Sequence, residues 1–219
     1  MTVSLSERAY HEIRQMIVRL DLAPGAVIRE DDLQASLGLG RTPIREALQR
    51  LVRDQFVTVI PRRGMYVSGI DVSELALLYE TRAMLEPFAA RLACARAKPE
   101  HWDRMAEVLD RARRPGTEAF ELIELDRSCH ELMWEAADNR FLTDTLDMLY
   151  AQSDRLWHMY LADVDDMGEA VTQHVEILDA LRDNNSEFAA TLVEGHIRSF
   201  DEQIRTAVRR RLESPLTNA

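Results

Sequence analysis

The stretch from Arg41 to Leu51 constrains the fold most, because its residues separate onto two sides of one helix. Thr42 suits the N-cap position, and Pro43 suits the first helical position, where no backbone N–H is needed. One face is apolar and consists of Ile44, Ala47, Leu48 and Leu51. The opposite face is polar and mainly basic, and it consists of Arg41, Arg45, Glu46, Gln49 and Arg50. The pattern predicts a short helix that packs on one side and presents arginines on the other.

A second predicted helix and a tight turn precede this stretch. Residues 30–37 repeat apolar side chains at helical spacing, and the sequence Gly-Leu-Gly at 38–40 ends them. Helix, short turn and basic helix together predict a helix-turn-helix. Beyond it, residues 56–60 and 65–67 are rich in β-branched and aromatic side chains. The turn sequence at 61–64 separates these two runs, which predicts a β-hairpin.

A further helix is expected ahead of these elements, from Ser6 to Leu20, and the turn sequence at 22–25 follows it. Its apolar stripe consists of Ala9, Ile13, Met16, Ile17 and Leu20. Residues 1–68 are therefore predicted to form a winged helix-turn-helix domain in which the hairpin is the wing.

The basic residues of this predicted domain point to double-stranded DNA as a partner. Arginines at a helix N-terminus can meet phosphates and guanine edges together, and Arg50 extends the same basic face. Arg62 and Arg63 lie at the tip of the predicted wing. Taken by itself, the stretch at 41–51 is equally compatible with an arginine-rich surface helix. The wing and the preceding helix favour a gene regulator.

Charge is unevenly distributed along the chain. Residues 1–70 contain 10 basic and 8 acidic side chains, whereas the whole chain contains 27 Lys and Arg against 38 Asp and Glu. An acidic total is compatible with DNA binding when the basic groups gather at the end that docks. The sequence has no basic and apolar leader and no apolar run near the roughly 18 residues of a membrane helix. With only two cysteines, Cys94 and Cys129, we expect a cytoplasmic protein without membrane association.

From residue 72 onward the sequence predicts helices throughout, because strand-like alternation is missing and Pro, Gly and Asn residues punctuate the apolar periodicity. Six helices are expected near 72–97, 100–113, 118–137, 141–161, 166–183 and 186–211. They predict an all-α antiparallel bundle over 72–213, joined to the first domain by a linker at 69–71 and followed by a tail at 214–219. The expected fold class is thus mostly α.

Four residues of the predicted bundle have the chemistry of metal ligands. Asp126 and His130 lie one turn apart on one helix, His174 lies on a later helix, and His196 lies on the last. One carboxylate and three imidazoles suit a divalent transition ion, and bundle interiors commonly build such sites from facing helices. The alternative is that they are hydrogen-bonded core residues, and the residues alone leave both possibilities open.

The N-terminal domain resembles the GntR family of bacterial transcription regulators. The resemblance rests on the sequences at 22–25, 28–33 and 41–48. It implies that residues matching Arg41, Thr42 and Arg45 touch a short palindromic operator, and that the wing near Arg63 and Gly64 reaches the minor groove. Some members place a DNA-contacting arginine where this chain has Asp31, so Arg29 is carried over in its place.

The helical half resembles the FCD effector domain of FadR-type members, in the six-helix, VanR-like form. The resemblance implies a homodimer and a bound ion, with zinc or nickel favoured, held by Asp126, His130, His174 and His196. It also implies that Arg82 faces a cavity and holds the carboxylate of a small organic acid effector. Without the resemblance, Arg82 would pair with Glu86 on the helix surface. For Cys129, next to a ligand, we expect a structural role.

Two other classes of protein compete with a ligand-responsive, metal-containing regulator. A site with three histidines and one aspartate could activate water in a metal-dependent enzyme, but no general-base motif or phosphate-binding loop accompanies it. A metal-free regulator could bind a large acyl ligand, but the metal-binding residues disfavour it. In the family that the chain resembles, repression relieved by ligand is the common mode, and activation is the alternative.

Overall fold

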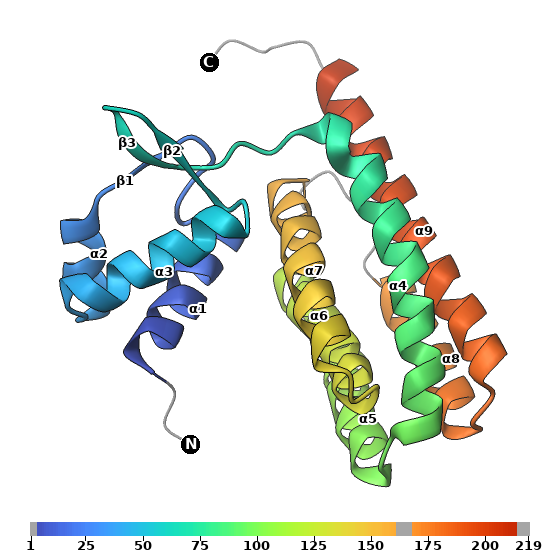
Figure 1. Cartoon of the computed structure of the whole chain (residues 1–219). Coiled ribbons are helices and arrows are strands. Elements are labelled where there is room, and N and C mark those ends of the chain that lie inside the picture. The colour runs from blue at the N-terminus through green and yellow to red at the C-terminus, as the bar shows by residue number, and fades with distance from the viewer. Residues whose placement is uncertain (1–3, 161–167, 214–219) are drawn as a thin grey trace. The chain divides into compact units, whose positions relative to one another are not determined.

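A computed structural model describes residues 4–160 and 168–213. The chain divides into two compact units, Met1–Val72 and Ser73–Ala219, each of which has its own core. The expected tail at 214–219 and the expected break at residues 163–166 lie outside the described residues. Figure 1 shows the elements of both units.

The described part of the N-terminal unit, from residue 4 onward, contains three helices and three short strands. In chain order these are α1 (Leu5–Val18), β1 (Val27–Ile28), α2 (Glu30–Leu37), α3 (Arg41–Arg53), β2 (Val57–Ile60) and β3 (Gly64–Val67). The apolar faces of α1 and α3 pack together, and Ile13, Ile44 and Leu48 are fully buried. Burial of each such side chain contributes roughly 1.5–3 kcal/mol to folding, so the apolar face of α3 fixes its basic face outward.

The turn between α2 and α3 forms as predicted, but α3 begins earlier than predicted. Gly38 ends α2 in the left-handed conformation, with φ 64°. The N-cap of α3 is Gly40, whose carbonyl accepts a hydrogen bond from the N–H of Ile44 at 3.4 Å. Thr42 as N-cap was therefore wrong, and Pro43 is the third helical residue rather than the first. Pro43 is tolerated there because none of the first N–H groups of a helix has an intrahelical acceptor.

The wing is a three-stranded antiparallel sheet with the strand order β1-β3-β2. The hairpin was predicted, and its register pairs Ile60 with Gly64 across a turn in which Arg62 has φ 67°. Strand β1 was not predicted, because two residues are too few for an alternating pattern. It pairs Val27 with Tyr66 and Ile28 with Met65, and so ties the base of the wing to the start of α2.

The described residues of the C-terminal unit form a bundle of six α-helices, as predicted. They are α4 (Leu75–Arg96), α5 (Pro99–Ala112), α6 (Ala119–Ala136), α7 (Arg140–Tyr160), α8 (Gly168–Arg182) and α9 (Ser186–Glu213), and a short 3-10 helix η1 (Val72–Glu74) precedes α4. Helix α4 packs along α9, and α6 contacts α4, α5, α7 and α8 (Figure 1). Among the described residues, no helix is long and apolar enough to cross a membrane.

Candidate functional site

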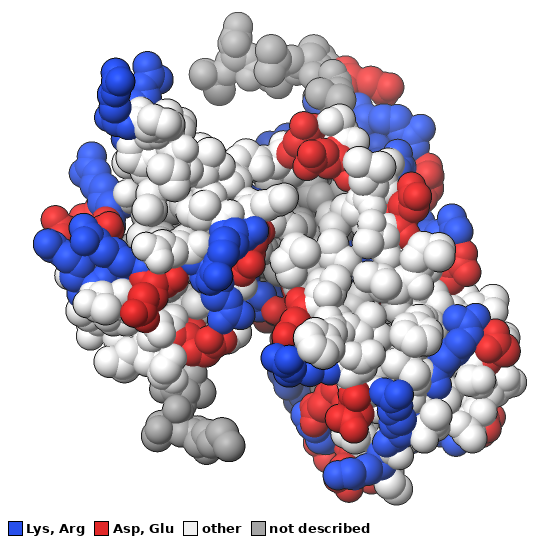
Figure 2. Space-filling view, in the orientation of Figure 1, with Lys and Arg blue, Asp and Glu red and all other residues white. Residues whose placement is uncertain are grey.

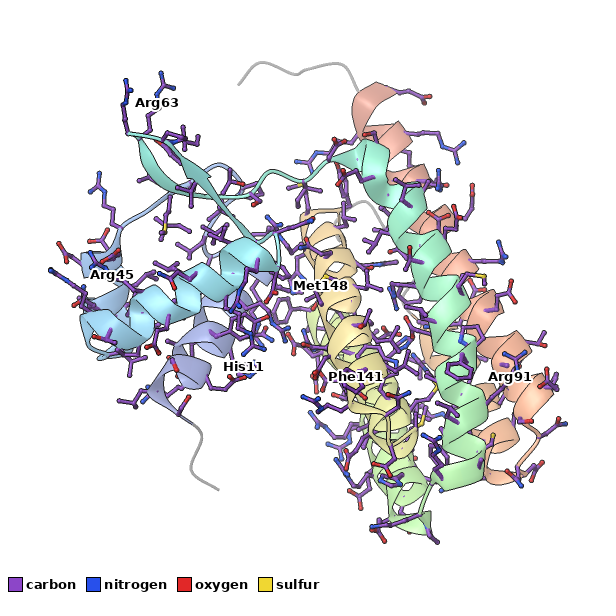
Figure 3. The ribbon with its side chains drawn as sticks, in the orientation of Figure 1. His11, Arg45, Arg63, Arg91, Phe141 and Met148 are labelled. Carbon is purple, nitrogen blue, oxygen red and sulfur yellow. The ribbon has the colours of Figure 1, made fainter. Side chains whose placement is uncertain are left out.

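The exposed face of α3 carries two of the predicted DNA-contacting arginines. The side chains of Arg41 and Arg45 are 62% and 57% exposed. Arg45 pairs with Glu30 at 2.8 Å, and Arg41 lies 3.7 Å from Asp31. Exposed pairs of this kind contribute about 0–1 kcal/mol, so both guanidinium groups can exchange these carboxylates for phosphates. Figure 3 shows Arg45 pointing away from the core of its unit.

The wing presents a second group of predicted residues. Arg62 and Arg63 are exposed at the turn between β2 and β3, and Gly64 follows with φ 108°, which favours glycine. Basic side chains gather at this tip in Figure 2, and Figure 3 labels Arg63 there. The tip is thus a basic projection suited to a phosphate-lined groove.

The remaining predicted residues of this unit lie in different surroundings. Thr42 is exposed in the first turn of α3, and Arg29 is exposed at the N-cap of α2. Arg50 instead lies against α1, where its guanidinium pairs with Glu7 at 2.8 Å and stacks 3.7 Å from the ring centroid of Tyr10. The structure therefore brings Arg50 to the junction of α1 and α3.

In the helical unit, the structure brings the four predicted metal ligands together. Asp126 and His130 come from α6, His174 from α8 and His196 from α9, and all four are buried. One ligand atom from each lies within 4.8 Å of those of the other three. Asp126 Oδ1 lies 2.8 Å from His174 Nε2 and 3.4 Å from His196 Nε2, while His130 Nε2 lies 3.2 Å from His196 Nε2.

These distances match the spacing of ligands around one ion. Metal–nitrogen and metal–oxygen bonds of about 2.1 Å place adjacent ligand atoms about 3.0–3.4 Å apart. The chemistry of the donor atoms also favours a bound cation. His130 and His196 each use Nδ1 for a hydrogen bond to an acceptor, so both Nε2 atoms face the Asp126 carboxylate as acceptors. A cation satisfies such a cluster of lone pairs, and the residues therefore fit a divalent transition ion.

Outer hydrogen bonds hold three of the four ligands in place. His130 Nδ1 donates to Glu86 Oε2 at 2.6 Å, and His196 Nδ1 donates to Gln173 Oε1 at 2.7 Å. Tyr150 donates its hydroxyl to Asp126 Oδ2 at 2.6 Å. Such partners fix ring orientation and increase ligand basicity. His174 Nδ1 is buried without a hydrogen-bond partner among the described residues.

The pKa shifts in the cluster favour the metal-binding protonation states. Burial lowers the pKa of His174, and burial together with His174 lowers the pKa of His196 to about 3. Burial alone would raise the pKa of Asp126, but the neighbouring His174 and His196 hold it well below its usual value. Burial and Asp126 raise the pKa of Tyr150, so its hydroxyl keeps its proton. These shifts favour neutral imidazoles at His174 and His196 beside an ionised carboxylate at Asp126.

Arg82 both pairs with Glu86 and faces a cavity, and the pair is buried rather than on the helix surface as expected from the residues alone. It is buried on α4, pairs with Glu86 at 2.7 Å, and lines a cavity beside Asp126 and Tyr150. That cavity and a second one, between Cys129 and His174, each have a volume of about 10 Å³. This is room for about one water molecule, so neither cavity holds an organic acid in this conformation.

Cys129 lines a different cavity from Arg82, and most of the side chains around it are apolar. It is 1% exposed and lines the second cavity with Leu125 and Val171. Burial raises the pKa of its thiol well above the usual value, and the charge on Asp126 adds to this effect. A protonated thiol is a weak metal ligand, which agrees with a structural role.

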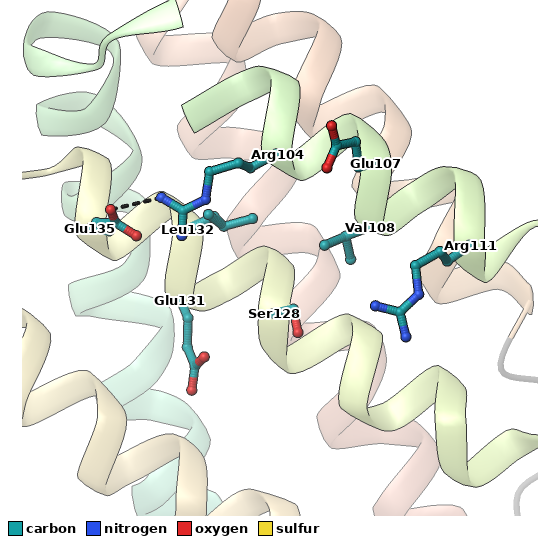
Figure 4. A pocket seen from close by; sticks show the side chains of 8 residues that line it. All are labelled: Arg104, Glu107, Val108, Arg111, Ser128, Glu131, Leu132 and Glu135. Atoms are coloured by element: carbon teal, nitrogen blue, oxygen red, sulfur yellow. Dashed lines mark hydrogen bonds and ion pairs between the residues drawn. The ribbon is translucent and has the colours of Figure 1, made fainter. Parts of the chain in front are cut away.

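A larger groove, of about 360 Å³, lies on the surface between α5 and α6 (Figure 4). Both of its arginines already have ion-pair partners, since Arg104 pairs with Glu135 at 2.8 Å and Arg111 lies 3.6 Å from Glu121, which is outside the lining. The titratable side chains that line this groove are exposed, whereas those of the His and Asp cluster are buried, so the cluster is the stronger candidate site.

Sequence reasoning missed several residues that complete the buried site. Tyr150 and Gln173 were not singled out, and Glu86 was considered only as a surface partner of Arg82. Their neighbours in sequence carry no motif that marks them. The available signal was a polar side chain on the buried face of a helix, as with Tyr150 on α7.

Comparison with known proteins agrees with both units. Residues 5–67 match the bacterial regulatory proteins of the gntR family, and residues 77–199 match the FCD domain. The chain belongs to the GntR family. It is a GntR-type transcriptional regulator with an FCD domain, and the family and its relatives are regulators rather than enzymes.

Similar proteins cover nearly the whole GntR-family chain. The Nta operon transcriptional regulator of Aminobacter aminovorans is 31% identical over 195 residues, which are 89% of this chain and 91% of that protein. The transcriptional repressor RspR of Escherichia coli is 26% identical and covers 93% of this chain and 90% of its own length. The structure of Escherichia coli McbR/YncC superimposes with a TM-score of 0.82 at 21% identity, covering 96% of this chain and 100% of that one, which shows a shared fold.

Proposed function

We propose that this GntR-family regulator is a cytoplasmic, ligand-responsive repressor. It binds a palindromic operator as a homodimer and holds one divalent transition ion in each FCD domain. A small organic acid is its effector. The observation that carries the proposal is the convergence of four buried metal-ligating side chains in a domain attached to a winged helix-turn-helix.

The exposed basic residues support the DNA-binding part of the proposal. Base contacts come from Arg41, Thr42 and Arg45 on α3, and phosphate or minor-groove contacts from Arg29, Arg62, Arg63 and Gly64. The position of Arg50 against α1 supports a role in fixing the angle of α3. Repression agrees with the name of RspR, a repressor.

The donor set supports zinc or nickel as the ion. Imidazole nitrogens suit both metals, and a single carboxylate completes four protein ligands. When bound, the ion supplies a Lewis-acidic centre on which an effector carboxylate can bind. Arg82 offers a guanidinium on the wall of the adjoining cavity, which favours a hydroxy acid, sugar acid or dicarboxylate.

The outer face of α4 supports a homodimer. Leu77, Met84 and Phe88 are exposed there at helical spacing, while the opposite face of α4 packs into the bundle. A helix that is apolar all round is usually covered on both sides. A second copy that places its own α4 against this face gives a two-fold dimer with two recognition helices.

Three measurements on the untagged protein test the proposal. Selection from random DNA duplexes should yield inverted repeats, and organic acids should then release the bound DNA. Mass spectrometry should find about one zinc or nickel ion per chain. Asymmetric selected sites would overturn the dimeric operator, and a chain that takes up neither metal when offered it would overturn the metal pocket.

The dimer has its own test. Met84→Glu introduces a charge in the centre of the exposed apolar face of α4 and should convert the protein to a monomer in analytical ultracentrifugation. Glu80→Gln, at an exposed position of the same helix, is the matched control and should remain dimeric. A dimeric Met84→Glu protein would place the interface elsewhere.

A further inference from the structure

The carboxylate of Glu86 is shared between two partners with different proposed roles. Its Oε1 accepts a hydrogen bond from Arg82 Nε at 2.7 Å, and its Oε2 accepts one from His130 Nδ1 at 2.6 Å. The side chains of all three residues are at most 3% exposed. Arg82, which lines the effector cavity, is thus connected to a metal ligand through one buried carboxylate.

Glu86 determines which ring nitrogen of His130 is available for the metal. Glu86 forms a buried ion pair with Arg82, and a carboxylate in such a pair can only accept hydrogen bonds. His130 Nδ1 must then carry the proton, and Nε2 presents its lone pair toward Asp126 and His196.

Arg82 in turn holds Glu86 in place through Nε, while its two terminal nitrogens remain available as donors. Among the described residues, no group accepts a hydrogen bond from the two terminal nitrogens of Arg82, and the residue lines the cavity beside Asp126. Its guanidinium lies 4.7 Å from the ring centroid of Tyr150. None of the described residues therefore uses the edge of Arg82 that binds carboxylates in a bidentate manner.

We propose that Glu86 is a positioning residue that couples Arg82 to the metal site, by holding His130 in the metal-binding tautomer with one oxygen and accepting from Arg82 with the other. An anion bound to the free edge of Arg82 and an ion bound to His130 then depend on the same carboxylate. By linkage, each changes the affinity of the site for the other. This inference rests on the proposed metal pocket and deepens it.

The first test is Glu86→Gln, measured by competition for Zn²⁺ with a chromophoric chelator. Arg82 and His130 contact two different oxygens of Glu86, and a glutamine of equal size replaces one of these oxygens with an NH₂ donor, so one of the two hydrogen bonds is lost. The Zn²⁺ affinity should fall 10- to 100-fold, as for other outer partners of metal ligands. The matched control is Glu80→Gln, exposed on the same helix, which should change the affinity less than about 2-fold. Equal Zn²⁺ affinity in Glu86→Gln and wild type would overturn the positioning role.

The second test is a double-mutant cycle that isolates the link to Arg82. Arg82→Met should change the Zn²⁺ affinity at least about 5-fold more in the presence of Glu86 than in the Glu86→Gln background. Gln173→Leu, which affects His196 instead, should combine with Glu86→Gln multiplicatively. If Arg82→Met acts by the same factor in both backgrounds, Arg82 influences the metal by charge alone and the link is overturned.

A third measurement needs no variant of Glu86. Nitrogen NMR of the metal-free wild type, with His130→Gln used for assignment, should show His130 protonated at Nδ1 and not at Nε2. The opposite tautomer would overturn the inference even if the variants fail to fold. A wild type that binds no Zn²⁺ would overturn the proposed metal pocket, whereas Zn²⁺ binding that is indifferent to Glu86 overturns this inference alone.

Discussion

Arg45 in the DNA-binding unit and Arg82 in the helical unit form ion pairs of nearly equal length with opposite consequences. Arg45 lies 2.8 Å from Glu30 and is 57% exposed, whereas Arg82 lies 2.7 Å from Glu86 and is 3% exposed. The exposed pair contributes at most about 1 kcal/mol, so Arg45 is free to take another partner. Removing one partner of a buried pair costs about 3–5 kcal/mol. Solvent exposure, rather than distance, separates an exchangeable contact from a fixed one.

The largest effect is expected from a substitution in the buried cluster of the helical unit. Asp126→Asn keeps the size of the side chain but removes the charge that faces two imidazoles. The Zn²⁺ affinity should fall at least about 100-fold, and added Zn²⁺ should no longer raise the melting temperature. Calorimetry and metal analysis measure both. Asp144→Asn, exposed on α7, is the control; a metal-replete Asp126→Asn protein would remove Asp126 from the site.

The next effect is expected at the exposed arginine of α3. Arg45→Ala should weaken specific operator binding by about 1–3 kcal/mol, roughly 5- to 150-fold, and leave the melting temperature within about 2 °C. Gel shifts at fixed salt measure the first and calorimetry the second. Arg53→Ala, in the last turn of the same helix, should retain nearly full affinity. Unchanged binding by Arg45→Ala would rule out α3 as the recognition helix.

A smaller and less specific effect is expected at the wing. Arg63→Ala should weaken binding to all duplexes by a similar factor and reduce the salt dependence of binding by about one phosphate contact. Titrations at several salt concentrations, with the operator and with an unrelated duplex, give both quantities. Selective loss of operator binding would instead mean that Arg63 reads base edges.

The smallest effect concerns the pair of Glu7 and Arg50. Burial alone would raise the pKa of Glu7, but the hydrogen bond and charge of Arg50 have the larger effect, and the pKa is lowered. The pair therefore stabilises the fold above about pH 4.5, and this contribution to stability is lost as the pH falls. Glu7→Gln should lower the free energy of unfolding at pH 7 by less than about 1 kcal/mol. The difference from wild type should shrink toward pH 4 in urea unfolding. A difference independent of pH would assign it to packing.

Local patterns in the sequence were enough to predict most of the fold. Apolar periodicity and Gly or Pro punctuation predicted all six helices of the bundle to within three residues at their described ends, as well as the turn that ends at Gly40. Strand β1 escaped because two residues show no period. Thr42 was misplaced because the chain enters α3 through the extended conformation of Gly40, which side-chain preference does not reveal.

The candidate site was predictable in its ligands and not in its connections. The spacing of Asp126 and His130, together with the family resemblance, pointed to four ligands that the structure brings together. The contacts of Glu86, Gln173 and Tyr150 depend on where α4, α7 and α8 meet α6 and α9. Contacts between different helices produce no periodic pattern in a single sequence, so they could be identified only from the packed structure.

The two cavities beside Asp126 have a consequence for the rate of the response. Each has room for about one water molecule, so an organic acid can enter the proposed effector site only after the surrounding helices have moved apart. The observed association rate should then level off with increasing effector concentration at the opening rate of the bundle. The packing of the FCD core, more than the concentration of effector, would set how quickly the regulator responds.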